Sequence, residues 1–386
     1  MNQSRSIYLD YNATAPVKPA VAAVIARTLE TGGNPSSVHA SGRAARLVVE
    51  HAREQVAGLL GASASDVIFT SGGTEANNLC LRSLHTAGRK LFVSAVEHPS
   101  VLATAAELDA TVIPVDQDGV VPVDTLASLL EEEAAGQGRP ALVSVMAANN
   151  ETGVVQPLRA LTDVAHRYGA LFHTDAVQAI GKISFDMKGL GVDLATVSAH
   201  KIGAAAGAGA LITSPDVGKM QGILTGGGQE KGLRPGTENL SGIAGFGAAA
   251  ELAHEDLARS GEITALRDDL ERLILEQAPQ TQIFGARADR IGNTSCLAMS
   301  GVESEVQVMT LDLEGIAVSA GSACSSGKVA SSPVLLAMGV TEAEAGNALR
   351  VSLGWATERK DIEEFVKAWA ALSERLGTKS EELTAA

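Results

Sequence analysis

Aromatic residues are scarce in this 386-residue chain, since Phe, Tyr and Trp together make up only 3% of it. An apolar core must therefore be built mainly from Ala, Val, Leu and Ile, within a composition that is ordinary for a globular protein. Basic residues are also in the minority, with 30 Lys and Arg against 45 Asp and Glu, for a formal charge of −15. This balance argues against a nucleic-acid-binding protein, which needs a basic face.

Cysteine is rare as well, and long hydrophobic runs are missing. The chain has three cysteines, so any disulfide scheme leaves one unpaired, and their spacing matches no zinc motif. Residues 1–10 contain no apolar segment of signal-peptide length, and no run approaches the length of a membrane span. We therefore expect a cytoplasmic protein with free thiols, no metal site and no membrane contact.

Short apolar, β-rich runs alternate with helical patterns from about residue 17 to residue 215. This alternation predicts an α/β domain whose mostly parallel sheet is covered by helices on both faces. In such sheets ligands bind beyond the carboxyl ends of the strands, so polar residues there are the candidates for a site. The seven expected strands are 67–70, 90–96, 111–115, 141–147, 170–175, 194–198 and 209–213.

A second, smaller block follows a Gly-rich stretch at 225–236. A long helical pattern covers about 240–277 and is interrupted near Gly261. Further elements are expected at 282–284, 294–299, 306–313, 348–353 and 361–376. We predict a large domain of residues 15–255 and a small α+β domain of residues 1–14 and 256–386.

Gly73 and Thr74 open a predicted helix directly after the strand that ends at Thr70. A helix start of this kind points N–H groups and the positive end of the helix dipole at an anion such as phosphate. An ordinary capped helix has the same sequence pattern, so both interpretations stay open here.

Two strand ends carry groups that suit a pyridine cofactor. Asp175 ends an apolar strand, where it either caps a helix or faces a protonated ring nitrogen, and Gln178 follows in the same turn. Lys201, after the next strand, lies among apolar residues and Gly, which lowers the pKa of an amine and favours covalent attachment to an aldehyde. A lone Lys after a strand is more often a solvated charge, but Asp and Lys on successive strand ends indicate pyridoxal phosphate. Ser198 and His200, beside Lys201, are candidates for binding the phosphate oxygens.

Three further polar residues each allow a structural and a functional interpretation. His98, between a strand and Pro99, suits either a helix cap or a ring that stacks on a cofactor and transfers protons. Asn150 falls in a turn at a strand's carboxyl end. Arg350 lies inside an apolar strand and needs an anion, which is either the carboxylate of an amino-acid substrate or a structural salt-bridge partner.

The three cysteines differ in their surroundings. Cys80 lies in a helical pattern and Cys296 in a strand pattern, so we expect both to be small buried hydrophobic residues. Cys324 lies in a stretch of Gly, Ser and Ala that suits an exposed, mobile loop. An exposed thiol is an oxidation liability, which favours a functional role for Cys324 over an incidental one.

In this order and with this spacing, these motifs resemble the NifS/IscS-type cysteine desulfurases. That group belongs to the class V aminotransferases among the fold-type I pyridoxal-phosphate enzymes. The resemblance covers nearly the whole chain through residues 8–16, 33–36, 70–75, 97–98, 149–151, 175–178, 198–201, 226–230, 234–239, 321–324 and 349–350. One departure lies at 203–207, where relatives usually have a Gly-Pro-containing run and this chain has three alanines between glycines, so the turn should be less restricted.

The resemblance implies a pyridoxal-phosphate-dependent transferase fold of type I, with pyridoxal 5′-phosphate as cofactor and conversion of L-cysteine to L-alanine as activity. It implies that Lys201 carries the cofactor and takes the α-proton, that Asp175 pairs with the ring nitrogen, and that His98 stacks on the ring. It places Gln178 and Asn150 beside the ring oxygen. The residues that it assigns to the phosphate are Gly73, Thr74, Ser198 and His200.

The resemblance also implies partners. Thr237 would reach the phosphate of a neighbouring subunit, which makes the active enzyme a homodimer. Arg350, with Asn150, would bind the substrate. Cys324 would receive the sulfur as a persulfide, and a loop at about 319–333 would deliver it to an acceptor protein such as an Fe–S scaffold.

Other functions remain as alternatives. A class V aminotransferase would not need Cys324, whereas a selenocysteine lyase is harder to separate because selenium leaves without an attacking thiol. A non-catalytic scaffold would be expected to have lost Lys201, Asp175 or Cys324, and all three are present.

Overall fold

The computed structural model describes residues 6–136, 140–321 and 331–384. Its large sheet has seven strands in the order β2-β8-β7-β6-β5-β3-β4, and only β8 runs antiparallel to its neighbours. The predicted seven-stranded, mostly parallel sheet is therefore confirmed. The strands are β2 (Val67–Thr70), β3 (Lys90–Ser94), β4 (Thr111–Ile113), β5 (Ala141–Ser144), β6 (Leu171–Asp175), β7 (Leu194–Ser198) and β8 (Gly209–Thr213).

Three of these strands end earlier than predicted. β3 ends at Ser94, β4 at Ile113 and β5 at Ser144, although the predicted strands continue to residues 96, 115 and 147. The continuations of β3 and β5 stay mostly buried but form loops at the carboxyl edge of the sheet. Hydrophobicity alone therefore predicted burial correctly and strand length too generously.

Alternate residues of most strands belong to two different apolar clusters, one on each face of the sheet. Phe69 and Phe92 belong to the cluster covered by α2 (Ala40–Leu60), α5 (Val123–Ala135), α6 (Leu158–Arg167) and α8 (Leu240–Ala258). Ile68 and Leu91 belong to the cluster covered by α3 (Gly73–Thr86) and α4 (Pro99–Glu107). This period of two is what buries a sheet on both faces.

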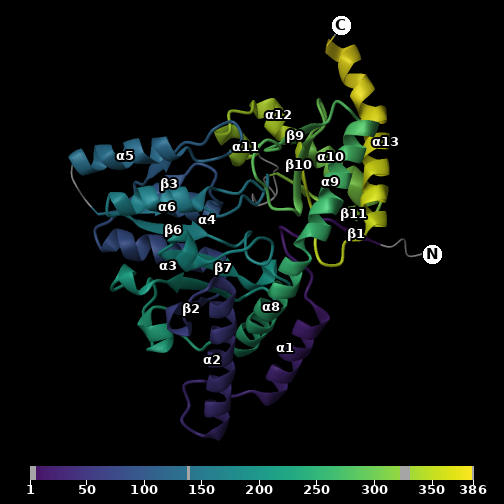
Figure 1. The fold of residues 1–386 in the computed structure, drawn as a ribbon. Coiled ribbons are helices and arrows are strands. Elements are labelled where there is room, and N and C mark those ends of the chain that lie inside the picture. Colours follow the sequence, from purple (N-terminus) through teal and green to yellow (C-terminus); the bar gives the residue numbers. More distant parts are fainter. Residues whose placement is uncertain (1–5, 137–139, 322–330, 385–386) are drawn as a thin grey trace.

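The small domain is built on a four-stranded antiparallel sheet in the order β12-β13-β10-β9. Its strands are β9 (Gln282–Phe284), β10 (Thr294–Ala298), β12 (Ser319–Ala320) and β13 (Ala348–Ser352). Three helices pack around its core, namely α9 (Ser260–Gln277), α10 (Ser304–Leu313) and α13 (Arg359–Thr384). Figure 1 shows α13, in yellow, alongside α9, and it continues past the predicted end at residue 376. The short helices α11 (Pro333–Ala337) and α12 (Glu342–Gly346) complete this part of the chain.

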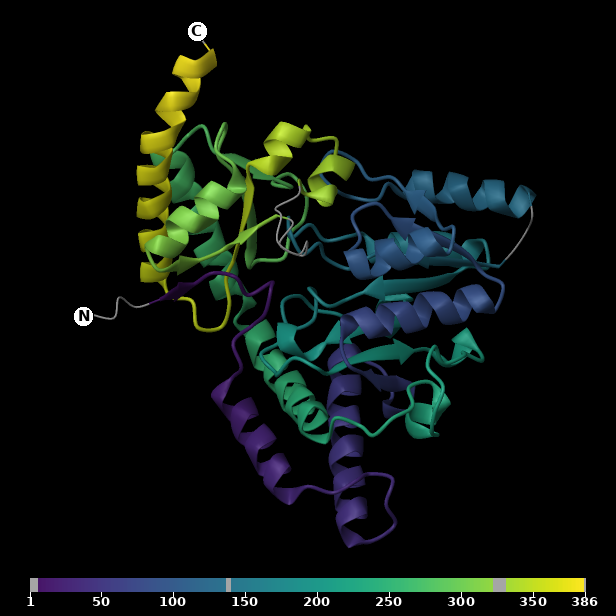
Figure 2. The ribbon, with the colours of Figure 1, turned by 180° about the vertical axis from the view of Figure 1, so that it is seen from behind.

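The N-terminal segment links the two domains. Strand β1 (Ile7–Tyr8) pairs in parallel with β11 (Ile316–Ala317), and Leu9 is buried in the small-domain core. The chain then crosses to the large domain and enters α1 (Pro19–Thr31), which packs against α8, as Figures 1 and 2 show. Residues 10–14 therefore run between the two sheets.

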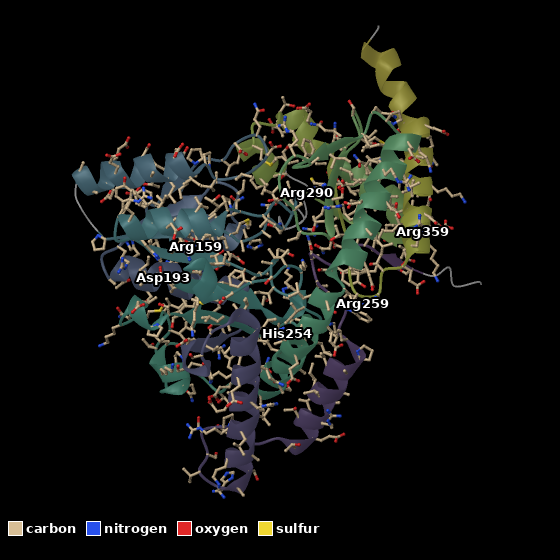
Figure 3. All side chains as sticks on the ribbon, viewed as in Figure 1. Arg159, Asp193, His254, Arg259, Arg290 and Arg359 are labelled. Atoms are coloured by element: carbon tan, nitrogen blue, oxygen red, sulfur yellow. The ribbon has the colours of Figure 1, made fainter. Side chains whose placement is uncertain are left out.

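The second link is the junction of α8 and α9. The long helical pattern is interrupted at Arg259, two residues before the expected position, and Figure 3 places this residue where the two helices meet. The proposed division into residues 15–255 and the remainder stays a prediction. None of the described helices is both long enough and apolar enough to cross a membrane.

Candidate active site

A cleft of about 690 Å³ opens at the carboxyl edge of the large sheet and is closed on its other side by the small domain. The cleft brings together side chains that lie at or after the ends of five strands of the large sheet, β2, β3, β5, β6 and β7, and Arg350 of β13. The predicted site residues that line it are Gly73, Thr74, His98, Asn150, Asp175, Gln178, Ser198, His200, Lys201 and Arg350. Thr237 is not among its lining residues, and Cys324 lies outside the residues that the structure describes.

Asp175, the last residue of β6, is held in place by two hydrogen bonds. Its Oδ2 accepts from Asn77 Nδ2 at 2.8 Å, and its Oδ1 accepts from the backbone N–H of Val177 at 3.0 Å. The residue is buried, with 6% of its surface exposed. A buried carboxylate fixed in this way is a strong acceptor for a protonated nitrogen in the cleft.

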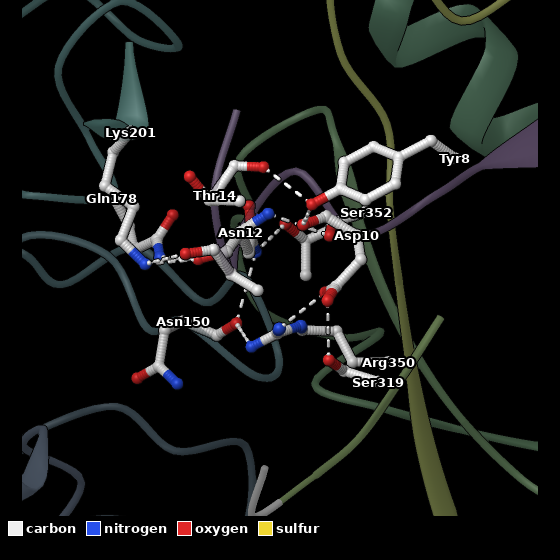
Figure 4. Close-up of polar contacts among 12 residues, drawn as sticks. Tyr8, Asp10, Asn12, Thr14, Asn150, Gln178, Lys201, Ser319, Arg350 and Ser352 are labelled. Atoms are coloured by element: carbon white, nitrogen blue, oxygen red, sulfur yellow. Dashed lines mark hydrogen bonds and ion pairs between the residues drawn. The ribbon is translucent and has the colours of Figure 1, made fainter. Parts of the chain in front are cut away.

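Lys201 contacts the N-terminal segment that crosses between the domains (Figure 4). Its Nζ donates to the carbonyl oxygens of Asn12, at 2.5 Å, and Ala13, at 2.9 Å. Gln178 Nε2 also donates to the Asn12 carbonyl, at 3.0 Å. The same main-chain oxygen thus positions the amine of Lys201 and the amide of Gln178.

A second lysine, Lys182, fixes the orientation of the amides around Lys201. Its Nζ donates to Asn12 Oδ1 at 2.8 Å and to Gln178 Oε1 at 2.5 Å. Because Oε1 of Gln178 accepts from Lys182, the amide NH₂ group is the end that is turned toward Asn12. Burial, together with the charges of Lys201 and Arg350, lowers the pKa of Lys182 well below its usual value.

Arg350 combines both interpretations that the sequence allows. Its Nη2 forms an ion pair with Asp10 Oδ1 at 2.8 Å, and its Nη1 donates to the carbonyl oxygen of Asn150 at 3.1 Å (Figure 4). Its buried Nε has no hydrogen-bond partner within the described part of the chain. A structural salt bridge is therefore present, and Arg350 also lines the cleft.

The phosphate end of the cleft is predicted at the start of α3. Gly73 and Thr74 lie in its first turn, where the backbone N–H groups have no acceptor within the helix. Burial, reinforced by the charge of Lys201, lowers the pKa of His200 to about 4, so its ring is neutral at pH 7. Thr237 is exposed on the loop before α8.

The turn after Lys201 is well defined despite its three alanines. Gly203 and Gly207 have φ angles of 84° and 92°, which only glycine adopts readily. Ala204 N–H donates to the Ala199 carbonyl at 3.2 Å, and Asn239 Nδ2 donates to the Gly207 carbonyl at 3.0 Å. The glycines permit the turn, and these hydrogen bonds hold it where a proline would otherwise restrict the backbone.

Two buried glutamates line the same cleft. Glu97 Oε1 accepts from the Met146 N–H at 2.5 Å, and burial, with the nearby charge of Asp175, raises its pKa well above the usual value. Burial also raises the pKa of Glu151 to about 7, although a hydrogen bond from Ser332 at 2.5 Å and the charge of Arg350 oppose the shift. Burial therefore favours the uncharged form of both carboxyl groups, and Glu151 changes protonation near pH 7.

His98 is both the N-cap of α4 and a wall of the cleft. Its Nδ1 accepts from the Ser100 N–H at 3.1 Å and lies 2.8 Å from Ser100 Oγ. Burial lowers its pKa; Asp175 opposes this shift and Lys201 adds to it.

Cys80 and Cys296 are buried, as predicted. Burial raises the pKa of both thiols, so neither supplies a thiolate at neutral pH. No cluster of three or more His, Cys, Asp or Glu within the described ranges has the geometry of a metal site.

Comparison with known proteins identifies the family. The class V aminotransferase model matches residues 7–365. The chain belongs to the class V aminotransferase family. It is 42% identical to a cysteine desulfurase of Cereibacter sphaeroides, with 96% of each chain covered, and 38% identical to the cysteine desulfurase IscS of Dictyoglomus turgidum, with 97% of this chain and 96% of the relative covered.

Solved structures agree with this assignment. A NifS-like protein from Rickettsia africae superposes with a TM-score of 0.89 at 36% identity, covering 96% of this chain and all of that one. The predicted fold type and the resemblance to NifS/IscS-type enzymes are confirmed. Pyridoxal phosphate is the cofactor of this family.

The cleft also fits this cofactor on its own geometry. Its volume lies in the range of small-molecule sites. The fixed Asp175 carboxylate suits a protonated ring nitrogen, the start of α3 suits a phosphate, and Lys201 is within the same cleft.

Several side chains complete the site although the sequence predicted no role for them. Asp10 and Asn12 lay within the N-terminal motif that carried the resemblance, and Lys182 lies four residues after Gln178. The sequence signal for Asp10 and Asn12 is that these two polar residues flank Tyr11 in an otherwise mostly apolar segment. The i,i+4 spacing of Gln178 and Lys182 was another signal, because such residues share a helical face.

Proposed function

We propose that this chain is a pyridoxal-phosphate-dependent cysteine desulfurase that converts L-cysteine to L-alanine and leaves the sulfur on Cys324. The observation that carries the proposal is that Arg350 lines the same cleft as Lys201 and Asp175. A guanidinium group in this place suits the carboxylate of an amino acid beside the cofactor residues. Support also comes from the relatives named cysteine desulfurase and from a solved relative, SspA in complex with cysteine, which is 29% identical over 90% of this chain.

The cofactor and substrate contacts are assigned as follows. Asp175 would hold the ring nitrogen, and Gln178 and Asn150 would lie on the side of the ring oxygen. Gly73, Thr74, Ser198 and His200 would hold the phosphate, with Thr237 of a neighbouring subunit. When bound, pyridoxal phosphate acts as an electron sink that makes the α-proton of an amino acid acidic.

The chain's own residues would then handle the substrate and its protons. Arg350 and Asn150 bind and orient the cysteine carboxylate. Lys201 carries the cofactor, and its amine is the group that takes the α-proton once it is released from the cofactor. His98, on the wall of the cleft, transfers protons. In the net reaction the Cys324 thiol and L-cysteine give a Cys324 persulfide and L-alanine, so a C–S bond breaks and an S–S bond forms with no outside oxidant.

We further propose that the enzyme is a cytoplasmic homodimer that passes its sulfur to an acceptor protein such as an Fe–S scaffold. The acidic charge of −15 favours a basic docking patch on that acceptor. The name IscS of a relative with 38% identity is consistent with a role in Fe–S assembly.

The decisive experiment measures sulfide and alanine from L-cysteine and a reductant. Wild type should give both in equal amounts, Cys324→Ala should retain the visible absorbance of the bound cofactor but release almost no sulfide, and Lys201→Ala should be inactive. Cys80→Ala is the matched control, because its thiol is buried outside the cleft and the variant should remain active.

Other outcomes would select another function. Full sulfide release by Cys324→Ala would contradict the persulfide step and favour a selenocysteine lyase. Turnover that requires an α-keto acid would favour an aminotransferase. A wild type that takes up no pyridoxal phosphate would favour the scaffold.

A further inference from the structure

A chain of hydrogen bonds connects His98 to Asp175 through two residues outside the predicted site. His98 Nδ1 lies 2.8 Å from Ser100 Oγ. Asn77 Nδ2 donates to Ser100 Oγ at 2.9 Å and to Asp175 Oδ2 at 2.8 Å. The chain therefore joins the start of α4, the first turns of α3 and the end of β6.

The orientation of the Asn77 amide follows from its neighbours. Asn77 is fully buried, and its Nδ2 uses one hydrogen for each of its two acceptors. Turning the amide over would bring Oδ1 against the Asp175 carboxylate, where two acceptors would repel each other. Asn77 therefore donates in both directions, and Asp175 receives a neutral donor that does not compensate its charge.

The positions of the protons on Ser100 and His98 follow in turn. His98 Nδ1 already accepts from the Ser100 N–H at 3.1 Å, so this nitrogen carries no proton. Ser100 Oγ receives a hydrogen from Asn77 and directs its own hydrogen to His98 Nδ1. A neutral His98 consequently carries its proton on Nε2, at the opposite edge of a ring that lines the cleft.

We propose that Ser100 is a positioning residue that holds His98 as the Nε2–H tautomer and, through Asn77, couples the His98 ring to the Asp175 carboxylate. The proposal rests on the proton-transfer role assigned to His98. In that role, neutral His98 presents a proton donor to the substrate, and it returns to this form after each proton transfer. The hydroxyl group acts through His98 and does not need to touch the substrate.

The charges around His98 are compatible with a neutral ring. Burial lowers its pKa, Asp175 opposes this shift from the end of β6, and Lys201 adds to it from the end of β7. Burial raises the pKa of Glu97, the preceding residue, and so favours its uncharged form.

The test is histidine-selective NMR on the full-length protein, with and without cofactor, using His98→Gln to assign the signal. Wild type should show the Nε2–H tautomer. Ser100→Ala should raise the His98 pKa by about half to one pH unit, because one hydrogen bond that favours neutral Nδ1 is lost. The pH dependence of kcat should shift in the same direction with little change in KM, and Ser100→Thr should restore both.

Thr104→Val is the matched control, because it removes another buried hydroxyl group from α4. Thr104 Oγ1 shares its one hydrogen between Asn78 Oδ1, at 3.0 Å, and the Ser100 carbonyl, at 3.2 Å, and within the described residues it forms no hydrogen bond with His98 or Asp175. An unchanged tautomer and pKa in Ser100→Ala, or an equal shift in Thr104→Val, would overturn the proposal. If wild type had no desulfurase activity but showed the expected NMR signature, the proposed function would be overturned and this coupling would remain.

Discussion

Glu151 is a buried side chain that changes protonation near neutral pH. Burial raises its pKa to about 7, above the usual value near 4.3 for an exposed glutamate. The folded protein therefore binds a proton at Glu151 over a pH range where the unfolded chain has released it. The stability that this proton contributes is complete below about pH 4.3 and is lost as the pH rises to about 7.

Glu151→Gln should remove this pH dependence. The variant stays neutral at every pH, so its free energy of unfolding relative to wild type should rise by about 3 kcal/mol between pH 4.5 and pH 8. Thermal midpoints of the cofactor-free protein, measured across this range, test the expectation. Glu131→Gln, an exposed glutamate of α5, controls for the loss of one formal charge. A constant difference between Glu151→Gln and wild type at all pH values would contradict it.

Some residues of the site could be predicted from the sequence, and others could not. His98, Asp175 and Lys201 were identifiable because each follows a buried apolar strand, where a polar side chain is conspicuous. The partner of Arg350 was not identifiable, because Asp10 lies 340 residues away and only the folded chain brings them together. Asn77 and Ser100 were missed because a polar residue in a helix is usually solvated, whereas Asn77 is fully buried.

At the scale of elements, a buried ion pair anchors the loop of residues 226–239 to α2. Both carboxylate oxygens of Glu230 accept from Arg53 of α2, at 2.7 and 2.8 Å, and Oε2 also accepts from the Phe69 N–H. Glu230 and Lys231 have φ angles of 45° and 60°, an unfavourable conformation for residues other than glycine. The ion pair therefore holds a strained turn, and this turn leads to Thr237.

Arg53→Met should destabilise the protein by about 3–5 kcal/mol, because it leaves the Glu230 carboxylate buried without its cation. The double variant Arg53→Met/Glu230→Gln should recover part of this loss, since no buried charge remains. Thermal unfolding measures both effects. Arg272→Met is the control, because the ion pairs of this exposed α9 residue should contribute little. Equal destabilisation by the single and double variants would show that lost packing, rather than the uncompensated charge, is the cause.

Helices and strands were predicted well where the period and length of the hydrophobic pattern determine them. They were predicted less well where pairing between distant parts of the chain determines them. An apolar run has the same pattern in parallel and antiparallel strands, so the reversed direction of β8 could not be predicted. The interruption of the long helix fell at Arg259 rather than Gly261, because the chain turns where α8 leaves the large domain, not where propensity is lowest.

At the scale of the whole molecule, Thr237 distinguishes a dimeric site from a monomeric one. It is exposed on the loop before α8 and does not line the cleft of its own chain. If Thr237 binds the phosphate of a neighbouring subunit, each site of the homodimer combines Lys201 of one chain with Thr237 of the other. A two-fold axis would then bring Lys201 of one subunit and Thr237 of the other together at the subunit interface in both sites.

Subunit mixing tests this arrangement. Lys201→Ala homodimers should be inactive, and Thr237→Asp homodimers should lose most cofactor because an added carboxylate repels the phosphate. A mixed dimer has one site with both residues intact, so random 1:1 mixing during refolding or co-expression should restore about a quarter of wild-type activity if association is unbiased. If Thr237 acted within its own chain, every site in every dimer would carry one of the two substitutions, and mixing would restore nothing. Separately purified variants that are assayed together without subunit exchange provide the control, and they should stay at the level of the homodimers.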